Sequence, residues 1–240
     1  HRSDCRRWTD RHSGRLTGEV CERSRSDYFA RVATGVHKGG DSGADLGWIA
    51  RWHLRRARPV VAGKSGETVL ARDDLFRSDF LDIWLMANCY FAISTGLGLD
   101  SIADIFRRPV VFVNYLPILD LEAWGPFITT PKHLSWASNQ RPLTLKEQLE
   151  HTSVNGHYYE AKGIKVSDLS SSEITETVLE MEARLSGTWE ETDEDIELHE
   201  KFWSELRAWP NFSKYHGWIH PEARLGAHYL RRSKDWLFNP

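Results

Sequence analysis

Hydrophobic side chains recur with helical and strand-like periods from about residue 77 onward. The first such segment, Asp79–Asn88, carries an apolar stripe at the spacing i, i+3, i+4 and i+7, which predicts an amphipathic helix. The stripe consists of Phe80, Ile83, Trp84 and Ala87. Ser78 directly precedes the segment and is the expected N-cap.

The next three segments complete a recognisable pattern. The apolar run 89–94 predicts a short buried strand, residues 100–106 predict a helix, and the β-branched run 110–114 predicts a second strand. Arg107, Arg108 and Pro109 are typical of a helix C-terminus. Helix, strand, glycine turn, helix and strand in this order indicate a parallel α/β sheet.

The C-terminal half is rich in helix signals. Thr144 and Glu147 form a capping box before an expected helix at 145–151. Gly187 is the expected end of a second helix, and Thr192 is the expected N-cap of a third. The complete set expected here is strands at 127–129 and 163–166, and helices at 145–151, 173–185, 193–209 and from Pro221 to about 230.

The first 70 residues show no lasting hydrophobic period. A short helix near 46–54 and a short strand at 59–62 are the only elements expected there. Lys and Arg outnumber Asp and Glu by 14 to 8 in residues 1–70, whereas Asp and Glu outnumber them by 26 to 17 in residues 71–240. This contrast predicts an irregular, poorly ordered basic segment at 1–74, disordered or truncated, followed by an α/β domain at 75–240 with a helical C-terminal tail.

Composition excludes several protein classes. No apolar run reaches the roughly 18–20 residues that cross a bilayer, and no apolar leader follows the polar start. The three cysteines lack zinc or disulfide spacing, so no metal and a reducing, cytoplasmic location are expected. Because the sequence begins with His1, we also consider that it is a fragment. A basic nucleic-acid-binding arm is disfavoured by the net acidity of residues 71–240.

The glycine turn between the first strand and the next helix is the strongest chemical signal. Ser94 and Thr95 end the strand, Gly96 and Gly98 follow, and a helix is expected to begin at Asp100. Glycine allows close backbone approach, and a helix N-terminus offers free amides to an anion. A phosphate group is therefore the natural ligand, although a purely structural turn explains the same residues equally well.

Two familiar phosphate-binding motifs are absent. The dinucleotide-binding pattern GxGxxG requires glycine at position 101, which is Ser101. A P-loop ending in Gly63-Lys64-Ser65 requires glycine at position 58, which is Arg58. Asp100 would repel a phosphate, so we expect it to cap the helix or to bind a sugar or ribose hydroxyl.

The segment from Arg77 to Asn114 resembles a family of bacterial proteins assigned as glycosyltransferases in surface-polysaccharide gene clusters. The shared features are a helix, an apolar strand ending in hydroxyls, a Gly-Leu turn, a helix, and an Arg-Pro strand ending in asparagine. Further segments that resemble the family in the same order are 127–132 with 141–144, 163–189, 192–203 and 221–237. The resemblance thus covers residues 75–240. Leu97 departs from it, because family members carry a small hydroxyl residue there.

The resemblance implies a Rossmann-like sheet with flanking helices, the C-terminal donor-binding half of a GT-B glycosyltransferase. Such an enzyme transfers a sugar from a nucleoside-diphosphate donor to a glycan or lipid-linked acceptor, and it needs no cofactor. The residues implied to bind the donor diphosphate are Ser94, Thr95, Gly96, Gly98, Leu99, Ser101, Lys132 and Arg141. Those implied to contact the base or sugar are Asp100, Asn114 and Tyr115. No catalytic residue is assigned.

Several alternatives remain open. A nucleotide-sugar epimerase and a non-catalytic nucleotide-binding remnant fit the same signals. Peripheral association with the inner face of the membrane is compatible with a lipid-linked acceptor, whereas nucleic acid is not an expected partner. His216 and His220 have a spacing that binds zinc on a helix, but Gly217 and Pro221 favour a loop there.

Overall fold

The computed structural model describes residues 79–96 and 98–238, together with the backbone of four short strands nearer the N-terminus. These strands are β1 (Arg6–Thr9), β2 (Leu16–Val20), β3 (Val60–Ala62) and β4 (Thr68–Leu70). β1 pairs antiparallel with β2, and β3 pairs antiparallel with β4. The strand expected at 59–62 is present as β3. The expected helix near 46–54, the poor order expected for residues 1–74 and the boundary near residue 75 lie outside the described residues.

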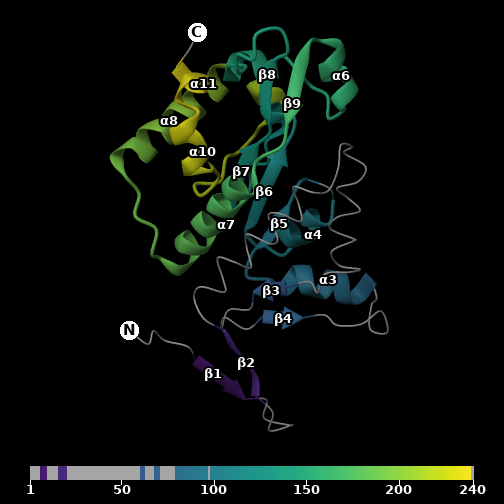
Figure 1. The fold of residues 1–240 in the computed structure, drawn as a ribbon, viewed down its shortest axis with the longest axis vertical. Helices are drawn as coiled ribbons and strands as arrows, with labels where there is room; N and C mark the ends of the chain where they lie inside the picture. Colours follow the sequence, from purple (N-terminus) through teal and green to yellow (C-terminus); the bar gives the residue numbers. More distant parts are fainter. Residues whose placement is uncertain are drawn as a thin grey trace.

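A four-stranded parallel sheet forms the centre of the described domain (Figure 1). Its strands are β5 (Ala92–Ser94), β6 (Val110–Tyr115), β7 (Phe127–Pro131) and β10 (Arg224–Leu225). They lie in the order β10-β7-β6-β5, and every neighbouring pair is parallel. The expectation of a parallel α/β sheet is therefore confirmed.

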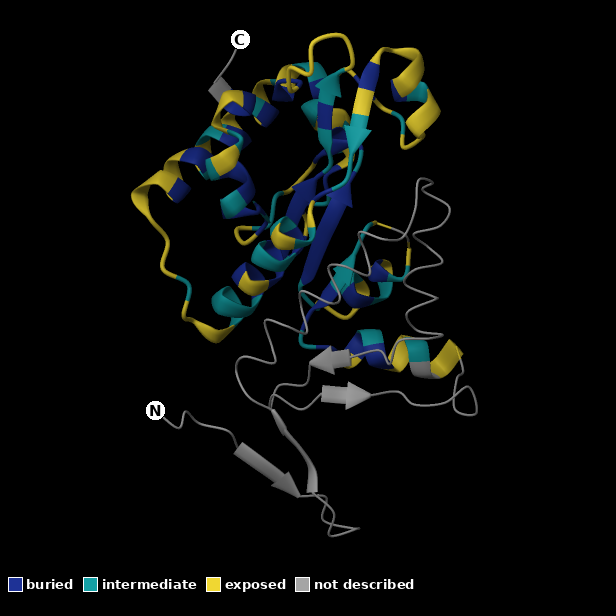
Figure 2. Ribbon diagram, viewed as in Figure 1, coloured by how far each residue is buried: buried dark blue, intermediate teal, exposed yellow. Residues whose placement is uncertain are grey.

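Strand β6 is buried along its whole length, as a run of apolar and β-branched residues in a parallel sheet requires. Figure 2 shows the strand in the colour of buried residues. Its side chains alternate between two cores. Val111 and Val113 enter the larger core, while Val110 and Phe112 enter the smaller one. The sheet is thus covered on both faces.

Four C-terminal helices enclose the larger core. They are α7 (Ser171–Ser186), α8 (Asp193–Ala208), α10 (Ala227–Arg232) and α11 (Lys234–Phe238). Capping boxes at Ser170 and Thr192 begin α7 and α8, and Gly187, with a φ of 72°, ends α7. These helix ends agree with the sequence expectations. Figure 1 shows α7, α8 and α10 together on one side of β6 and β7.

Two shorter helices are associated with the smaller core, α3 (Asp79–Asn88) and α4 (Asp100–Ile105). Ala103 of α4 and Cys89, just after α3, pack with Phe112 and Phe127 of the sheet. The predicted apolar stripe of α3 is wrong, however. Phe80, Ile83 and Trp84 are 73%, 43% and 47% exposed, whereas Leu85 and Ala87 are buried. The helix carries apolar residues on nearly every side, so its hydrophobic period alone could not select the buried face.

The connections between strands carry the remaining elements. The 3₁₀ helix η2 (Ile118–Asp120) follows β6, and β8 (His133–Trp136) follows β7 and pairs antiparallel with β9 (Ile164–Ser167). The short helices are α5 (Leu145–Gln148), α6 (Gly156–Ala161) and α9 (Phe212–Tyr215). The Thr144–Glu147 capping box is present as expected. No helix in the described part of the chain combines the length and apolar character needed to cross a bilayer.

The helix expected to begin at Pro221 is absent, and this segment instead contributes the fourth strand. Arg224 and Leu225 pair with Ile128 and Thr129 of β7. The helix α10 begins only after Gly226. A two-residue strand is too short to leave an alternating pattern in the sequence, and its partner lies almost a hundred positions earlier in the chain.

Gly226 lies where the backbone passes very close to β7 and α7. We therefore expect too little space at this position for any residue larger than glycine. A Cβ at this position would lie 2.7 Å from Oγ1 of Thr130, which is hydrogen-bonded to Thr177. Gly226→Ala should lower the free energy of unfolding by about 1–3 kcal/mol, measured by urea denaturation.

Two further variants control this prediction. Gly156→Ala, at the start of α6 where nothing lies within 4 Å of the new Cβ, should be neutral or slightly stabilising. Thr130→Ala removes the obstructing oxygen, so the double variant should be more stable than the sum of the single effects predicts. Strict additivity would contradict a steric origin.

Candidate functional site

The glycine turn joins the carboxyl end of β5 to α4, as the sequence predicts. Gly96 and Gly98 have φ values of 81° and 95°, in the region that favours glycine. A Cβ on Gly96 would lie 3.3 Å from Cε2 of Tyr115, the last residue of β6. The turn therefore lies against the carboxyl end of the neighbouring strand, where open α/β sheets bind ligands.

Several amides of this turn already have partners within the chain. The amide of Gly96 donates to Oγ of Ser94 at 3.1 Å, that of Ser101 to the carbonyl of Gly98 at 3.3 Å, and that of Ile102 to the carbonyl of Leu99 at 3.1 Å. Helix α4 contains only six residues, so its dipole is small. Leu97 lies outside the described residues. The turn consequently offers an anion fewer free donors than the sequence suggests.

Asp100 does not cap α4, contrary to the sequence-based expectation. The N-cap position is Leu99, which makes no side-chain capping bond, and Asp100 is the first helical residue. Asp100 is only 4% exposed, and its Oδ1 atom has no hydrogen-bond partner. A buried carboxylate oxygen without a partner is costly, so it needs a functional or structural explanation.

The loop after β6 brings further carboxyl groups toward Asp100. Burial, together with the negative charges of Asp100 and Asp104, raises the pKa of Glu122 to about 7. Asp104 itself accepts a 2.8 Å hydrogen bond from Nε1 of Trp124. These groups form what we call the acidic cluster, consisting of Asp100, Asp104 and Glu122.

The hydroxyl of Tyr115 belongs to the same environment. It donates to the carbonyl of Asp120 at 2.8 Å. Burial and the negative charges of Glu122, Asp120 and Asp100 all raise the pKa of Tyr115. Tyr115 is therefore a neutral hydrogen-bonding group that lies between the glycine turn and the acidic cluster.

Asn114 occupies the opposite side of the same strand end. Its φ of 54° is unusual for a non-glycine residue, and it coincides with a break in the pairing of β6 with β7. Its Oδ1 atom accepts a 2.7 Å hydrogen bond from the amide of Leu169, just before α7. Asn114 is 3% exposed, and its Nδ2 group has no partner. The side chain thus joins the end of β6 to the start of α7.

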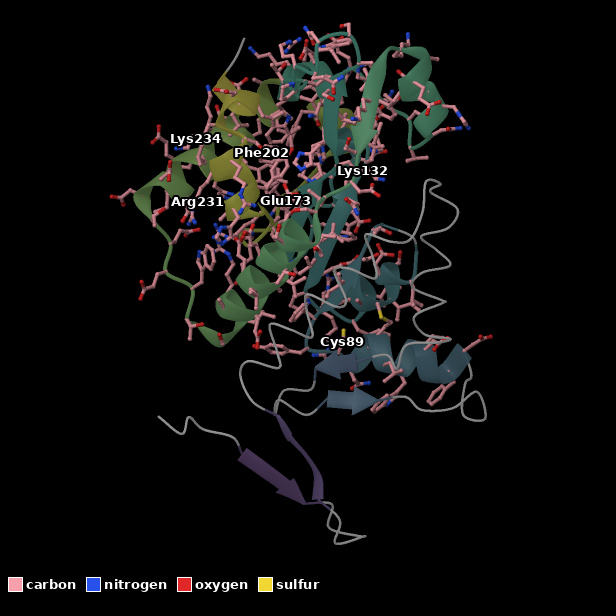
Figure 3. All side chains as sticks on the ribbon, viewed as in Figure 1. Cys89, Lys132, Glu173, Phe202, Arg231 and Lys234 are labelled. Carbon is pink, nitrogen blue, oxygen red and sulfur yellow. The ribbon has the colours of Figure 1, made fainter. Side chains whose placement is uncertain are left out.

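Two basic side chains accompany Asn114 at the carboxyl end of β7. Nζ of Lys132 lies 2.5 Å from Oδ1 of Asp168, and Nε2 of His133 lies 2.8 Å from Oε1 of Glu173. Lys132 and Glu173 are labelled in Figure 3. His133 also stacks on Tyr229, with 5.8 Å between the ring centroids. We call this group, Asn114, Lys132, His133 and the first turn of α7, the basic cluster.

Arg141 lies at the other end of strand β8 from Lys132. Its carbonyl accepts the amide of Trp136, the last residue of β8. Its guanidinium contacts both carboxylate oxygens of Glu147 at 2.6 and 3.1 Å, and these hydrogen bonds lower the pKa of Glu147 to about 2. Arg141 therefore has a local structural role, and its side chain does not lie beside that of Lys132.

The sequence-predicted residues thus divide into three groups. Ser94, Thr95, Gly96, Gly98, Leu99, Asp100, Ser101 and Tyr115 gather at the carboxyl ends of β5 and β6. Asn114 and Lys132 lie at the ends of β6 and β7, and Arg141 lies apart from both. The sequence reasoning missed Glu122, His133 and Asp168, because each is an isolated polar residue in a loop or short strand with no motif around it.

The expected loop around His216 and His220 is present between α9 and β10. His216 is buried, and this burial lowers its pKa. No group of three or more His, Cys, Asp or Glu side chains within residues 79–96 and 98–238 is arranged to hold a metal ion. Comparisons with protein-family models, with curated proteins and with solved structures found no match.

We expect Asn114 to be sensitive to both its backbone conformation and its hydrogen bond. Both Asn114→Gly and Asn114→Ala remove the hydrogen bond to Leu169. Alanine also keeps a Cβ at positive φ but has no polar side-chain group to stabilise that backbone conformation, whereas glycine has no Cβ. Alanine should therefore be less stable than glycine by about 1 kcal/mol in urea denaturation. The exposed Gln140, with a φ of 60°, is a control, because Gln140→Ala should change stability by less than about 0.5 kcal/mol. Equal stability of the two Asn114 variants would refute backbone strain.

The raised pKa of Glu122 predicts a specific dependence of stability on pH. Between its ordinary value of 4.5 and about 7, the folded state binds more protons than the unfolded state, so stability falls as the pH rises through this window. Glu122→Gln removes this loss. The free energy of unfolding of the variant, relative to that of the parent protein, should therefore rise by on the order of 2 kcal/mol from pH 5 to pH 8, allowing for partial solvent exposure.

Thermal or urea unfolding at the two pH values measures this difference. Glu200→Gln, at an exposed position on α8, provides the matched control and should change the free energy of unfolding equally at the two pH values. A Glu122→Gln effect that is independent of pH would show that the carboxyl group is not protonated near neutrality.

Proposed function

We propose that this protein is a glycosyltransferase that takes a sugar from a nucleoside-diphosphate donor. Two observations support the proposal. Residues 75–240 resemble a family of bacterial glycosyltransferases in several separate segments, and the described part of this region contains a parallel α/β sheet flanked by helices. In the same proposal, the domain corresponds to the donor-binding half of a GT-B fold, and the acceptor is a glycan or a lipid-linked sugar.

The basic cluster is the single observation that carries the proposal. Sheets of this type bind ligands beyond the carboxyl ends of their strands. Asn114 lies near the carboxyl end of β6, and Lys132 directly follows the adjacent strand β7. Helix α7 begins at the same place and has 16 residues. Its first-turn amides at Ser171 and Ser172 have no partners within the helix, which favours an anion nearby.

Lys132 can exchange its present partner for a phosphate. Its side chain is 18% exposed and pairs with Asp168, whose side chain is 29% exposed. A nucleotide diphosphate carries more charge than one carboxylate, and it can accept hydrogen bonds from Lys132, from the Nδ2 group of Asn114 and from the helix amides. Neutralising the leaving diphosphate in this way needs no metal ion.

The glycine turn has a secondary role in this proposal. Its internal hydrogen bonds and the adjacent acidic cluster both disfavour a diphosphate directly above it. The rival hypotheses are a nucleotide-binding domain without transfer activity and a nucleotide-sugar epimerase. We infer a cytoplasmic location, where nucleotide sugars are the donors, with contact to the inner face of the membrane when the acceptor is lipid-linked.

Two measurements on the full chain separate these hypotheses. Saturation-transfer NMR with UDP, GDP and CMP tests for nucleotide binding. Incubation with the corresponding radiolabelled sugar nucleotides, followed by product analysis, tests for transfer, epimerisation or hydrolysis. Binding without any product would support the non-catalytic alternative, and absence of binding to all three nucleotides would refute the proposed function.

Lys132→Met should weaken binding of the preferred nucleoside diphosphate about tenfold or more, because it removes a charge-assisted hydrogen bond worth roughly 1.5–3 kcal/mol. Lys165→Met is the matched control, since Lys165 is an exposed lysine on β9, which pairs with β8, the strand that begins directly after Lys132. Titration calorimetry measures both. Equal affinity of the two variants would exclude Lys132 from the diphosphate site.

A further inference from the structure

Two arginine side chains converge on one loop carboxylate near the amino end of the sheet, at the edge opposite the proposed donor site. Arg184 comes from the last turn of α7, and Arg224 is the first residue of β10, which runs parallel to β7. Nη2 of Arg184 lies 3.1 Å and Nη1 of Arg224 lies 2.9 Å from Oε1 of Glu191. Glu191 belongs to the connection between α7 and α8. We call these three residues the arginine cluster.

The two arginines are held in place by contacts that do not involve Glu191. Nε of Arg184 donates a 3.0 Å hydrogen bond to Glu180, whose side chain is fully buried. The guanidinium of Arg184 also lies 4.8 Å from the centre of the Trp189 ring. The backbone of Arg224 is fixed by the pairing of β10 with β7. The two cations therefore remain neighbours when the loop carboxylate moves away.

Glu191 is bound less completely than two other carboxylates that pair with arginine. In each of those pairs both carboxylate oxygens contact a single arginine, with two distances of 2.6 Å; the pairs are Arg231–Asp195 and Arg232–Glu176. Glu191 instead offers one oxygen to two arginines at longer distances, and its Oε2 atom makes no hydrogen bond within the described part of the chain. Its side chain is 28% exposed. Glu191 is thus a ligand of the arginine pair that another anion can replace.

The positive charge of the arginine pair is only partly offset by Glu191. Burial, together with the charge of Arg184, lowers the pKa of Arg224, and Glu191 opposes this shift with a smaller effect. Burial, together with the charges of neighbouring arginines, also lowers the pKa of His199 to about 4. The effect of Arg224 on His199 again exceeds the opposing effect of Glu191. An anion that carries two negative charges would balance the pair better than one carboxylate does.

Trp189 provides an observation that is independent of these charges. Its ring lies against the guanidinium of Arg184, and its Nε1 group is buried without a hydrogen-bond partner. A buried indole N–H group without an acceptor is costly, and an oxygen atom of a bound anion can satisfy it. The side chains of Arg184 and Arg224 are 18% and 21% exposed, so a small anion can reach them from solvent.

We propose that Arg184 and Arg224 form a binding site for a phosphate group, which takes the place of Glu191. A phosphate dianion carries more charge than a carboxylate, and its oxygens can accept hydrogen bonds from both guanidinium groups at once. Binding releases the side chain of Glu191 to solvent. The inference is independent of the proposed transferase function, because none of the residues assigned to the donor belongs to the arginine cluster.

NMR titration of the full chain at constant ionic strength tests this site. The indole N–H signal of Trp189, identified by its loss in Trp189→Phe, should shift on addition of inorganic phosphate or of glucose 6-phosphate. The tighter of the two ligands distinguishes free phosphate from a phosphate ester. Glu191→Gln removes the competing charge and should tighten binding about tenfold. Arg224→Met in the Glu191→Gln background should weaken it about tenfold or more.

Three control variants locate the effect. Glu176→Gln and Arg232→Met remove the same kinds of charge from an exposed ion pair, so phosphate affinity at Trp189 should be unchanged. Lys132→Met should also leave it unchanged, which separates this site from the proposed donor site. Thermal unfolding verifies that every variant is folded.

Each other outcome overturns the assignment. If the signal of Trp189 responds to neither ligand in the parent protein or in Glu191→Gln, the arginine cluster is a structural ion-pair network only. If Glu191→Gln binds no more tightly than the parent protein, Glu191 does not compete for the site. If Arg224→Met leaves the affinity unchanged, the phosphate binds elsewhere. Nucleotide binding is measured separately, so none of these results decides the transferase proposal.

Discussion

The burial of β6 on both faces is the constraint on which the described structure depends. Its run of six buried residues must be covered by apolar groups on two sides. The C-terminal helices provide one cover and the α3–α4 segment the other, so two cores of unequal size form. Helix α4 follows β5, and α7 begins beside the end of β6, so one helix of each layer begins near the carboxyl edge of the sheet. The chemistry-bearing residues are brought to this edge by the same requirement.

The irregular end of β6 divides this edge into two chemical environments. A regular strand already alternates its side chains, but the positive φ at Asn114 also breaks the pairing with β7 and directs the carboxamide to the start of α7. Tyr115 then faces the glycine turn and the carboxylates of α4 and its neighbouring loop. Basic and acidic groups are consequently separated by the strand itself, although they are adjacent in sequence.

The sequence predicted those features that depend on local signals. Capping residues such as Thr144 and Thr192 mark helix starts through bonds to residues three positions away, and the β-branched run of β6 indicates a buried strand by itself. Features that depend on distant contacts were missed or misassigned. β10 becomes a strand only because β7 offers an edge, and the buried face of α3 is selected by α4. Glu122 gains its raised pKa from burial and from the charges of Asp100 and Asp104, and no local pattern in the sequence indicates any of these.

The other buried carboxylates show that Asp100 is unusual within its own fold. Three carboxyl side chains are buried in the described part of the chain: Asp100, Glu180 and Asp195. Glu180 accepts bonds from Arg184 and from the amide of Ala227 at 3.0 and 2.7 Å, and Asp195 accepts two bonds of 2.6 Å from Arg231. Where a buried carboxylate supports structure, then, this protein provides a cation for it. Within the described residues no cation is paired with Asp100, and its Oδ1 atom has no hydrogen-bond partner, an arrangement that costs stability and is typical of sites selected for chemistry rather than for folding.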